Sequence, residues 1–105
     1  MRVQDILDAL ERISAYTRDM DADRFRADDR TVEAVCFAFI VIGEAAGHVP
    51  EEVRQRALAV PWTKMRGMRN IAAHEYFGID RQLLWETARH DVAALVGPLR
   101  ELLGD

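Results

Sequence analysis

The chain has 105 residues, of which 50% are hydrophobic, and a formal net charge of −4. This length predicts one domain with a compact core, and the acidic balance excludes broad electrostatic binding of nucleic acid, so any RNA contact must be local. We expect a cytoplasmic protein without membrane contact, because no stretch has the ~20 apolar residues that cross a bilayer and the first residues lack the apolar segment of a secretory signal.

Apolar residues at helical spacing predict a first helix over residues 2–18. The charged stretch that follows, residues 18–30, offers only Phe25 to a core, so we expect a loop or frayed connection there. Asp28 or Asp29 can cap the next helix, because aspartate side chains accept hydrogen bonds from the first free N–H groups of a helix.

A second helix is predicted over residues 30–48, and within it Ala34–Ile42 is apolar without interruption. A helix that is apolar all round is buried on several sides. It is either the central helix of a monomeric bundle or partly covered by a second copy of the chain, and the small size of the domain favours a homodimer. Gly43 and Gly47 each cost about 1 kcal/mol in a helix relative to alanine, which a close approach of another helix would explain.

Glu44 follows the apolar run and would lie at the edge of the core. Its carboxylate could pair with an arginine of a later helix and hold that arginine in place. Alternatively, it could pair with His48, one turn further along the same helix. His48 lies near the helix end, where the helix dipole favours a cation, and no catalytic role is assigned to it.

Three further helices are predicted. A short one begins at Pro50 and ends at about Ala59, and a longer one covers residues 61–77, with proline in each first turn. Gly78 would end the longer helix and Asp80 would cap the last one, in which Pro98 would introduce a kink or an early end. Strand signals are absent, so the expected fold is an all-α bundle of four main helices and one short helix.

The helix predicted over residues 61–77 gathers polar side chains on one face. At about 100° per residue, an arc of about 160° holds five of them: Arg66, Arg69, Asn70, His74 and Tyr76. Arginine supplies fixed charge and planar donors for phosphate oxygens, and histidine exchanges protons near neutral pH. The alternative is a solvated face with a basic turn. A site here would need a second surface, because one helix face is convex.

Other chemistry has little support in the sequence. There is no HExxH motif, no paired cysteine and no glycine-rich phosphate loop. Neither a metal nor another cofactor is therefore expected, and the polar face remains the candidate site.

The sequence resembles HEPN-domain proteins. Arg69–Tyr76 reads RNIAAHEY and fits the R-x4-H-x-Y motif of these proteins. Ile42–Ala46 resembles the IGEA segment of their HepT-type toxin branch, and Trp62, Met68–Asn70 and Ala73–Asp80 recur there in the same order. The resemblance covers nearly the whole chain, and it implies a single HEPN/HepT-like domain over residues 1–105.

This resemblance implies a metal-independent endoribonuclease, the toxin of a type VII-like HepT/nucleotidyltransferase toxin–antitoxin pair. His74 would transfer protons, Arg69 would neutralise charge on the phosphorus oxygens, and Asn70 would position the phosphate or the imidazole. Two copies of the motif would face each other across a homodimer groove. Besides the catalytic residues, the substrate-binding set would be Arg66, Lys64 and Glu44.

The motif tyrosine, Tyr76, has its own implied role, because a cognate nucleotidyltransferase antitoxin would transfer AMP to it and block the site. The alternative is a structural tyrosine with a hydrogen-bonded hydroxyl. A function of another class also stays open: a non-catalytic helical partner that binds nucleotide or presents substrate to a nucleotidyltransferase. The acidic balance of the chain suits this second function.

Overall fold

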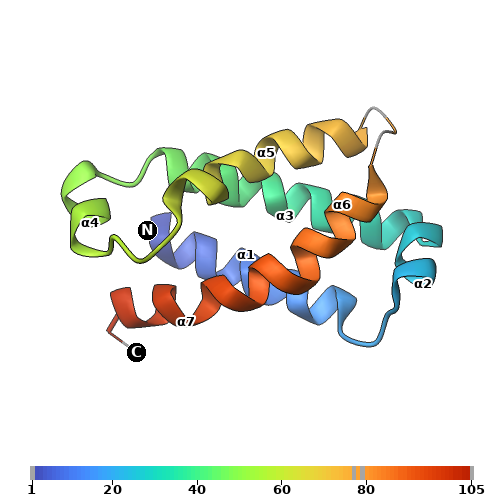
Figure 1. The fold of residues 1–105 in the computed structure, drawn as a ribbon, viewed down its shortest axis with the longest axis horizontal. Helices are drawn as coiled ribbons and strands as arrows, with labels where there is room; N and C mark the ends of the chain where they lie inside the picture. Colours follow the sequence, from blue (N-terminus) through green and yellow to red (C-terminus); the bar gives the residue numbers. More distant parts are fainter. Residues whose placement is uncertain (1, 77, 79, 105) are drawn as a thin grey trace.

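The computed structural model describes residues 2–76, 78 and 80–104, except for the side chains of Arg2, Glu75 and Tyr76. These residues form an elongated helical bundle of 41 × 26 × 20 Å, and no strand occurs among them (Figure 1). Its elements in chain order are α1 (Arg2–Thr17), α2 (Ala22–Ala27), α3 (Asp29–Gly47), α4 (Glu51–Arg56), α5 (Trp62–Tyr76), α6 (Arg81–Glu86), the π-helical turn η1 (Thr87–Asp91) and α7 (Val92–Leu102).

Helix α3 is the centre of the bundle, because it packs extensively on both α1 and α5, while α7 covers α1 (Figure 1). Helices α3 and α5 run in opposite directions, and α2 and α4 lie at opposite ends of the molecule. The apolar stripe predicted for the first helix is buried throughout, so that prediction and the all-α fold class are confirmed. Within the described part of the chain, no helix is long and apolar enough to span a membrane.

The long apolar run of α3 is only partly covered by the rest of the chain. One side of the run forms core, whereas Phe37 is 66% exposed and Ile40 is 43% exposed. Large apolar side chains that are left bare on a central helix mark a surface that could take a partner. The buried members of the run are Val35, Ala38, Phe39 and Ile42.

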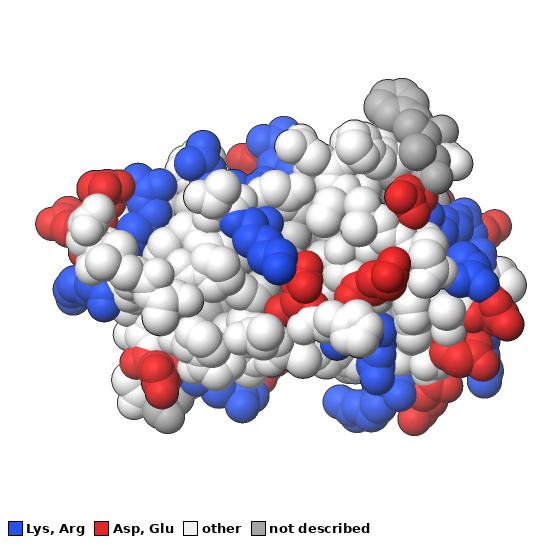
Figure 2. All heavy atoms as spheres, in the orientation of Figure 1, with Lys and Arg blue, Asp and Glu red and all other residues white. Residues whose placement is uncertain are grey.

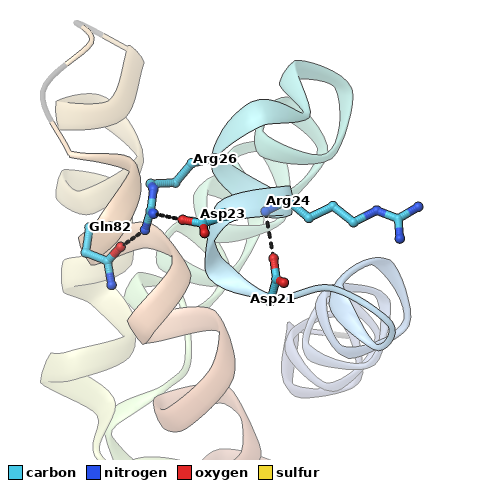
Figure 3. Close-up of polar contacts among 5 residues, drawn as sticks. All are labelled: Asp21, Asp23, Arg24, Arg26 and Gln82. Atoms are coloured by element: carbon cyan, nitrogen blue, oxygen red, sulfur yellow. Dashed lines mark hydrogen bonds and ion pairs between the residues drawn. The ribbon is translucent and has the colours of Figure 1, made fainter.

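The prediction of a loop or frayed connection over residues 18–30 is wrong, because this segment contains the helix α2. The Asp21 side chain caps α2 by accepting the Arg24 N–H at 2.8 Å, and Figure 3 shows this contact. Figure 3 also shows Arg26 between Asp23 of the same helix and Gln82 of α6. The described residues therefore contain the short helix α2 in addition to the predicted short helix α4, while the six-residue α6 continues through η1 into α7.

Aromatic packing explains why α2 is helical despite its charge. Phe25 is fully buried, and its ring lies 5.2 Å from the ring of Trp85. The Arg89 guanidinium sits over that tryptophan at 5.5 Å. A single buried aromatic side chain thus fixes α2 to the bundle, which sequence periodicity over a short segment does not reveal.

The short helix α4 ends at Arg56, earlier than predicted, because the chain turns after Ala57. The Ala57 carbonyl accepts the Val60 N–H at 3.0 Å and the Trp62 indole N–H at 3.1 Å. Trp62 is itself buried, so this turn is anchored to the core.

The last helix begins as predicted and continues further. Gly78 has a left-handed φ of 81°, and the Asp80 side chain caps α6 by accepting the Leu83 N–H at 2.8 Å. Pro98, however, does not end the helix, because α7 continues through it to Leu102. The irregular turn lies earlier, in η1, where the buried Thr87 hydroxyl donates to the Leu83 carbonyl at 2.8 Å.

Candidate functional site

The polar face of α5 meets α3 at a glycine. A Cβ added to Gly43 would lie 2.4 Å from Cγ of Arg69 and 3.1 Å from its backbone nitrogen. Gly43 is therefore required by the close approach of the two helices, as predicted. The same explanation is wrong for Gly47, where an added Cβ would meet no described atom within 4 Å.

Glu44 forms an ion pair with Arg69, with 2.5 Å between the carboxylate oxygen and the guanidinium nitrogen. Of the two alternatives left open for Glu44, the pair with an arginine of the later helix is thus confirmed. The His48 ring instead contacts the main chain, because its Nδ1 donates to the Glu44 carbonyl oxygen at 2.8 Å. Glu44 therefore holds Arg69 with its side chain and His48 with its backbone.

A groove of about 630 Å³ runs between the C-terminal half of α3 and α5. It supplies the concavity that a single helix face lacks, and both walls come from one chain. The side chain of Arg69 is 57% exposed, so it can reach a ligand while its carboxylate partner holds it. The polar residues that line the groove are Glu44, His48, Thr63, Arg66, Arg69 and Asn70.

Arg69 also borders a second hollow, of about 970 Å³, which lies further toward the N-terminal end of α3 and the C-terminal end of α5. Its lining includes the exposed Phe37 and Ile40 of α3, and it also contains four charged residues, Asp29, Glu33, Arg69 and Arg81. Arg69 and Ala73 line both the groove and this hollow.

The structure does not bring all of the predicted site residues into the groove. His74 is exposed one turn beyond Asn70, but the described groove lining does not include it. Lys64 points away toward η1, where its ammonium lies 3.4 Å from the Asp91 carboxylate. The Tyr76 side chain lies outside the described residues, so its prediction is untested.

His48 lines the groove, although no catalytic role was predicted for it from the sequence. It lies four residues after Glu44, and this spacing places both on the α3 face that meets α5. The spacing was visible in the sequence, but it could not show which neighbour the imidazole contacts.

Charges of both signs are mixed on the surface. On the face drawn in Figure 2, lysine and arginine groups are interspersed with aspartate and glutamate groups, and neither sign covers an extended area. Among residues 2–76, 78 and 80–104, no three histidine, cysteine or acidic side chains lie together where they could hold a metal ion. The polar groups of the groove are thus two guanidinium groups, an amide, an imidazole, a hydroxyl and the Glu44 carboxylate.

Comparisons with known proteins agree with the motif resemblance. A protein named "Probable ribonuclease HepT" from Thermococcus cleftensis is 35% identical over 100 residues, which cover 95% of this chain and 91% of the relative. A protein named "Putative RNase" from Methanocaldococcus jannaschii is 39% identical over 88 residues, covering 84% of this chain and 81% of the relative. No solved structure shows a significant match. Residues 6–102 match the family described as "Ribonuclease HepT-like", and the chain therefore belongs to that family.

Proposed function

We propose that this protein is a metal-independent endoribonuclease that binds the RNA backbone in the groove between α3 and α5. The observation that carries the proposal is the position of Arg69, which Glu44 holds over Gly43 beside Arg66 and Asn70. A guanidinium that is held in place before substrate arrives can neutralise charge that develops on phosphorus oxygens without having to reorganise. The names of the relatives and the family match support the same activity.

The proposed reaction needs two proton transfers. The ribose 2′-hydroxyl loses its proton and its oxygen attacks phosphorus, and the bond from phosphorus to the 5′-oxygen breaks. The leaving oxygen then takes up a proton, which leaves a 2′,3′-cyclic phosphate and a 5′-hydroxyl. His74 would serve as base or acid in this sequence, Arg69 would neutralise the phosphate, and Asn70 would orient the phosphate or the imidazole.

A homodimer would complete the site in this proposal. Phe37 and Ile40 leave an apolar area bare next to Arg69, and His74 lies beyond the groove of its own chain. A second copy seated on this area would bring two motif helices together. We expect Phe37→Glu to convert a dimer into a monomer in sedimentation experiments and to reduce cleavage. A wild-type chain that sediments as a monomer at assay concentrations would argue against this arrangement.

The test of the activity is a cleavage assay on total RNA in the presence of EDTA. The wild-type chain should cut RNA and leave 2′,3′-cyclic phosphate ends, whereas His74→Ala should be inactive with an unchanged circular dichroism spectrum. His90→Ala is the matched control, because His90 is exposed on η1 and does not line the groove. Cleavage that persists in His74→Ala, or that EDTA abolishes in the wild type, would contradict the mechanism.

The finer part of the proposal is regulation by a toxin–antitoxin partner. A cognate nucleotidyltransferase would transfer AMP to Tyr76, adding negative charge and bulk to the motif helix and so opposing the binding of RNA phosphates. Co-expression with such an enzyme should add the mass of one or more AMP groups, and Tyr76→Phe should abolish the addition. If the wild-type chain stays unmodified after co-expression, the proposal of AMP transfer is contradicted, and the alternative of a structural tyrosine is favoured.

The second candidate is a non-catalytic helical subunit that binds nucleotide for a nucleotidyltransferase. The net charge of −4 favours it, because an acidic protein has little general attraction for RNA. The same cleavage assay separates the two functions. RNA that stays intact at high protein concentration would favour the subunit role.

A further inference from the structure

The groove holds an imidazole that differs from the motif histidine. Of the three histidines, all within the described residues, His48 is the one that lines the groove. It stands directly after the end of α3, across from Thr63, Arg66 and Gly67 of α5. Its position in the groove is therefore independent of a second copy of the chain.

A hydrogen bond fixes which His48 nitrogen carries the proton. The Glu44 carbonyl oxygen, 2.8 Å from Nδ1, can only accept, so Nδ1 must donate. In the neutral ring the other nitrogen, Nε2, then has a free lone pair. This is the form that a general base requires, and the hydrogen bond also sets the orientation of the ring.

Glu44 links this imidazole to the phosphate-binding arginine. The Glu44 carboxylate pairs with Arg69, and its carbonyl accepts from His48. A base and a cation that both contact one residue of a helix are brought to the same part of the groove. Proximity of this kind is what general-base attack next to a neutralised phosphate requires.

We propose that His48 is the general base of the cleavage reaction, an inference that rests on the proposed ribonuclease function. Its Nε2 takes the proton of the ribose 2′-hydroxyl as the 2′-oxygen forms its bond to phosphorus. The bond from phosphorus to the 5′-oxygen breaks, and the 5′-oxygen receives its proton from His74 as the acid. Arg69 and Arg66 hold the non-bridging phosphate oxygens meanwhile. His48 returns its proton to water before the next turnover.

The charged groups around His48 come from three elements. Glu44 of α3 and the arginines Arg66 and Arg69 of α5 line the same groove. Arg56, at the end of α4, lines an adjoining hollow together with His48. Each of these four charged groups can affect the pH dependence of the reaction. The variants whose pH profiles are compared should therefore all retain Glu44, Arg56, Arg66 and Arg69.

A purely structural role is the competing explanation, because the imidazole also satisfies one of the last carbonyl groups of α3. His48→Asn separates the two roles, since the asparagine side chain offers an N–H donor but cannot transfer a proton near neutral pH. His48→Ala removes both functions. His90→Asn is the matched control, because His90 is exposed on η1, away from the groove.

The experiment measures cleavage of a short RNA in EDTA as a function of pH, together with thermal melting. We expect His48→Asn to melt like the wild type but to cleave about 100-fold more slowly or worse, as is typical when a general base is lost. The decline of the wild-type rate toward acidic pH should also disappear in this variant. His90→Asn should match the wild type in both rate and pH profile.

The possible failures can be told apart. A wild-type chain that does not cut RNA overturns the ribonuclease function and this inference together. An active wild type with a His48→Asn variant that cuts equally fast overturns the inference alone. The inference is also overturned if His48→Asn loses rate only in proportion to its loss of folded protein, or keeps the acidic decline of the wild type.

Discussion

Helix α3 carries an ion pair to a later helix at each of its ends. At the N-terminal end, the Asp29 carboxylate pairs with Arg81 of α6 at 2.9 Å. At the C-terminal end, the Glu44 carboxylate pairs with Arg69 of α5 at 2.5 Å. Exposed pairs of this kind contribute about 0–1 kcal/mol to stability, so the pairs themselves do not distinguish the two ends.

The surroundings of the two pairs differ. Arg81 also donates to the Arg26 carbonyl at 2.7 Å, next to the buried contact of Phe25 with Trp85. This guanidinium therefore ties α2 and α6 to the start of α3. Arg69 instead crosses Gly43 and lines the groove together with Glu44, whereas Asp29 and Arg81 line only the second hollow. The comparison teaches that the same ion-pair chemistry joins three helices at one end of α3 and leaves a cation exposed in a groove at the other.

The largest expected effect comes from disrupting the packing at the N-terminal end of α3, the structural end, where α2 and α6 meet it. Phe25→Ala should lower the free energy of unfolding by about 3–5 kcal/mol, because it removes a fully buried aromatic ring that anchors α2. Chemical denaturation measures this loss. Cleavage per folded molecule should stay close to that of the wild type, since the groove lies at the other end of α3. Leu58→Ala, at a side chain that is 73% exposed, is the control and should change stability by less than about 0.5 kcal/mol.

The next largest effect comes from a substitution at the C-terminal end of α3, the proposed functional end, where Gly43 contacts Arg69. Gly43→Ala would place a methyl group 2.4 Å from Cγ of Arg69, so the arginine must move away from its carboxylate partner. We expect a loss of about 1–3 kcal/mol in unfolding free energy and cleavage as low as in Arg69→Ala. For stability alone, Gly47→Ala is the control, because its new methyl group meets no described atom within 4 Å. That control should be neutral or gain up to about 1 kcal/mol.

Removing the carboxylate charge of each ion pair in turn should have a smaller effect on activity. Glu44→Gln keeps the shape of the side chain but removes the charge that holds Arg69, and we expect cleavage to fall about tenfold, or about 1.4 kcal/mol in transition-state stabilisation. Asp29→Asn makes the same change at the other end and should leave cleavage unchanged. Both variants should stay within about 1 kcal/mol of the wild-type stability. Equal activities for the two variants would show that the pairs do not have different roles.

Much of this arrangement could be predicted from the sequence, because helical periodicity and capping are local properties. The long helices, the Asp80 cap and the left-handed Gly78 follow from patterns within a few residues. The pairing of Glu44 with Arg69 was one of two stated alternatives, since the sequence places an acid and an arginine on helices that must pack together.

The remaining features depend on contacts between distant segments. Phe25 stabilises α2 only because Trp85, sixty residues later, packs against it. Lys64 is turned from the groove by an aspartate of η1, and the place of His48 depends on how closely α5 approaches α3 at Gly43. Periodicity within one helix contains no information about such contacts.

The smallest expected effect concerns Asp28, which caps the start of α3. Its carboxylate accepts the Thr31 N–H at 3.2 Å, and this bond and a further one from the Thr31 side chain lower the pKa of Asp28 below its ordinary value of 3.8. A carboxyl group whose pKa is lowered by folding stabilises the protein above its unfolded pKa, and this contribution is lost as the pH falls through the folded pKa.

Asp28→Asn keeps a side-chain oxygen that can cap the helix but removes the titration. The wild type should therefore melt slightly above Asp28→Asn at pH 7, and the difference should shrink as the pH is lowered below 3.8. A difference that stays constant or grows in acid would show that Asp28 acts through packing and not through its charge. Cleavage at pH 7 should be the same in both proteins, because this cap lies at the structural end of α3, whereas Arg69 and Glu44 lie at the functional end.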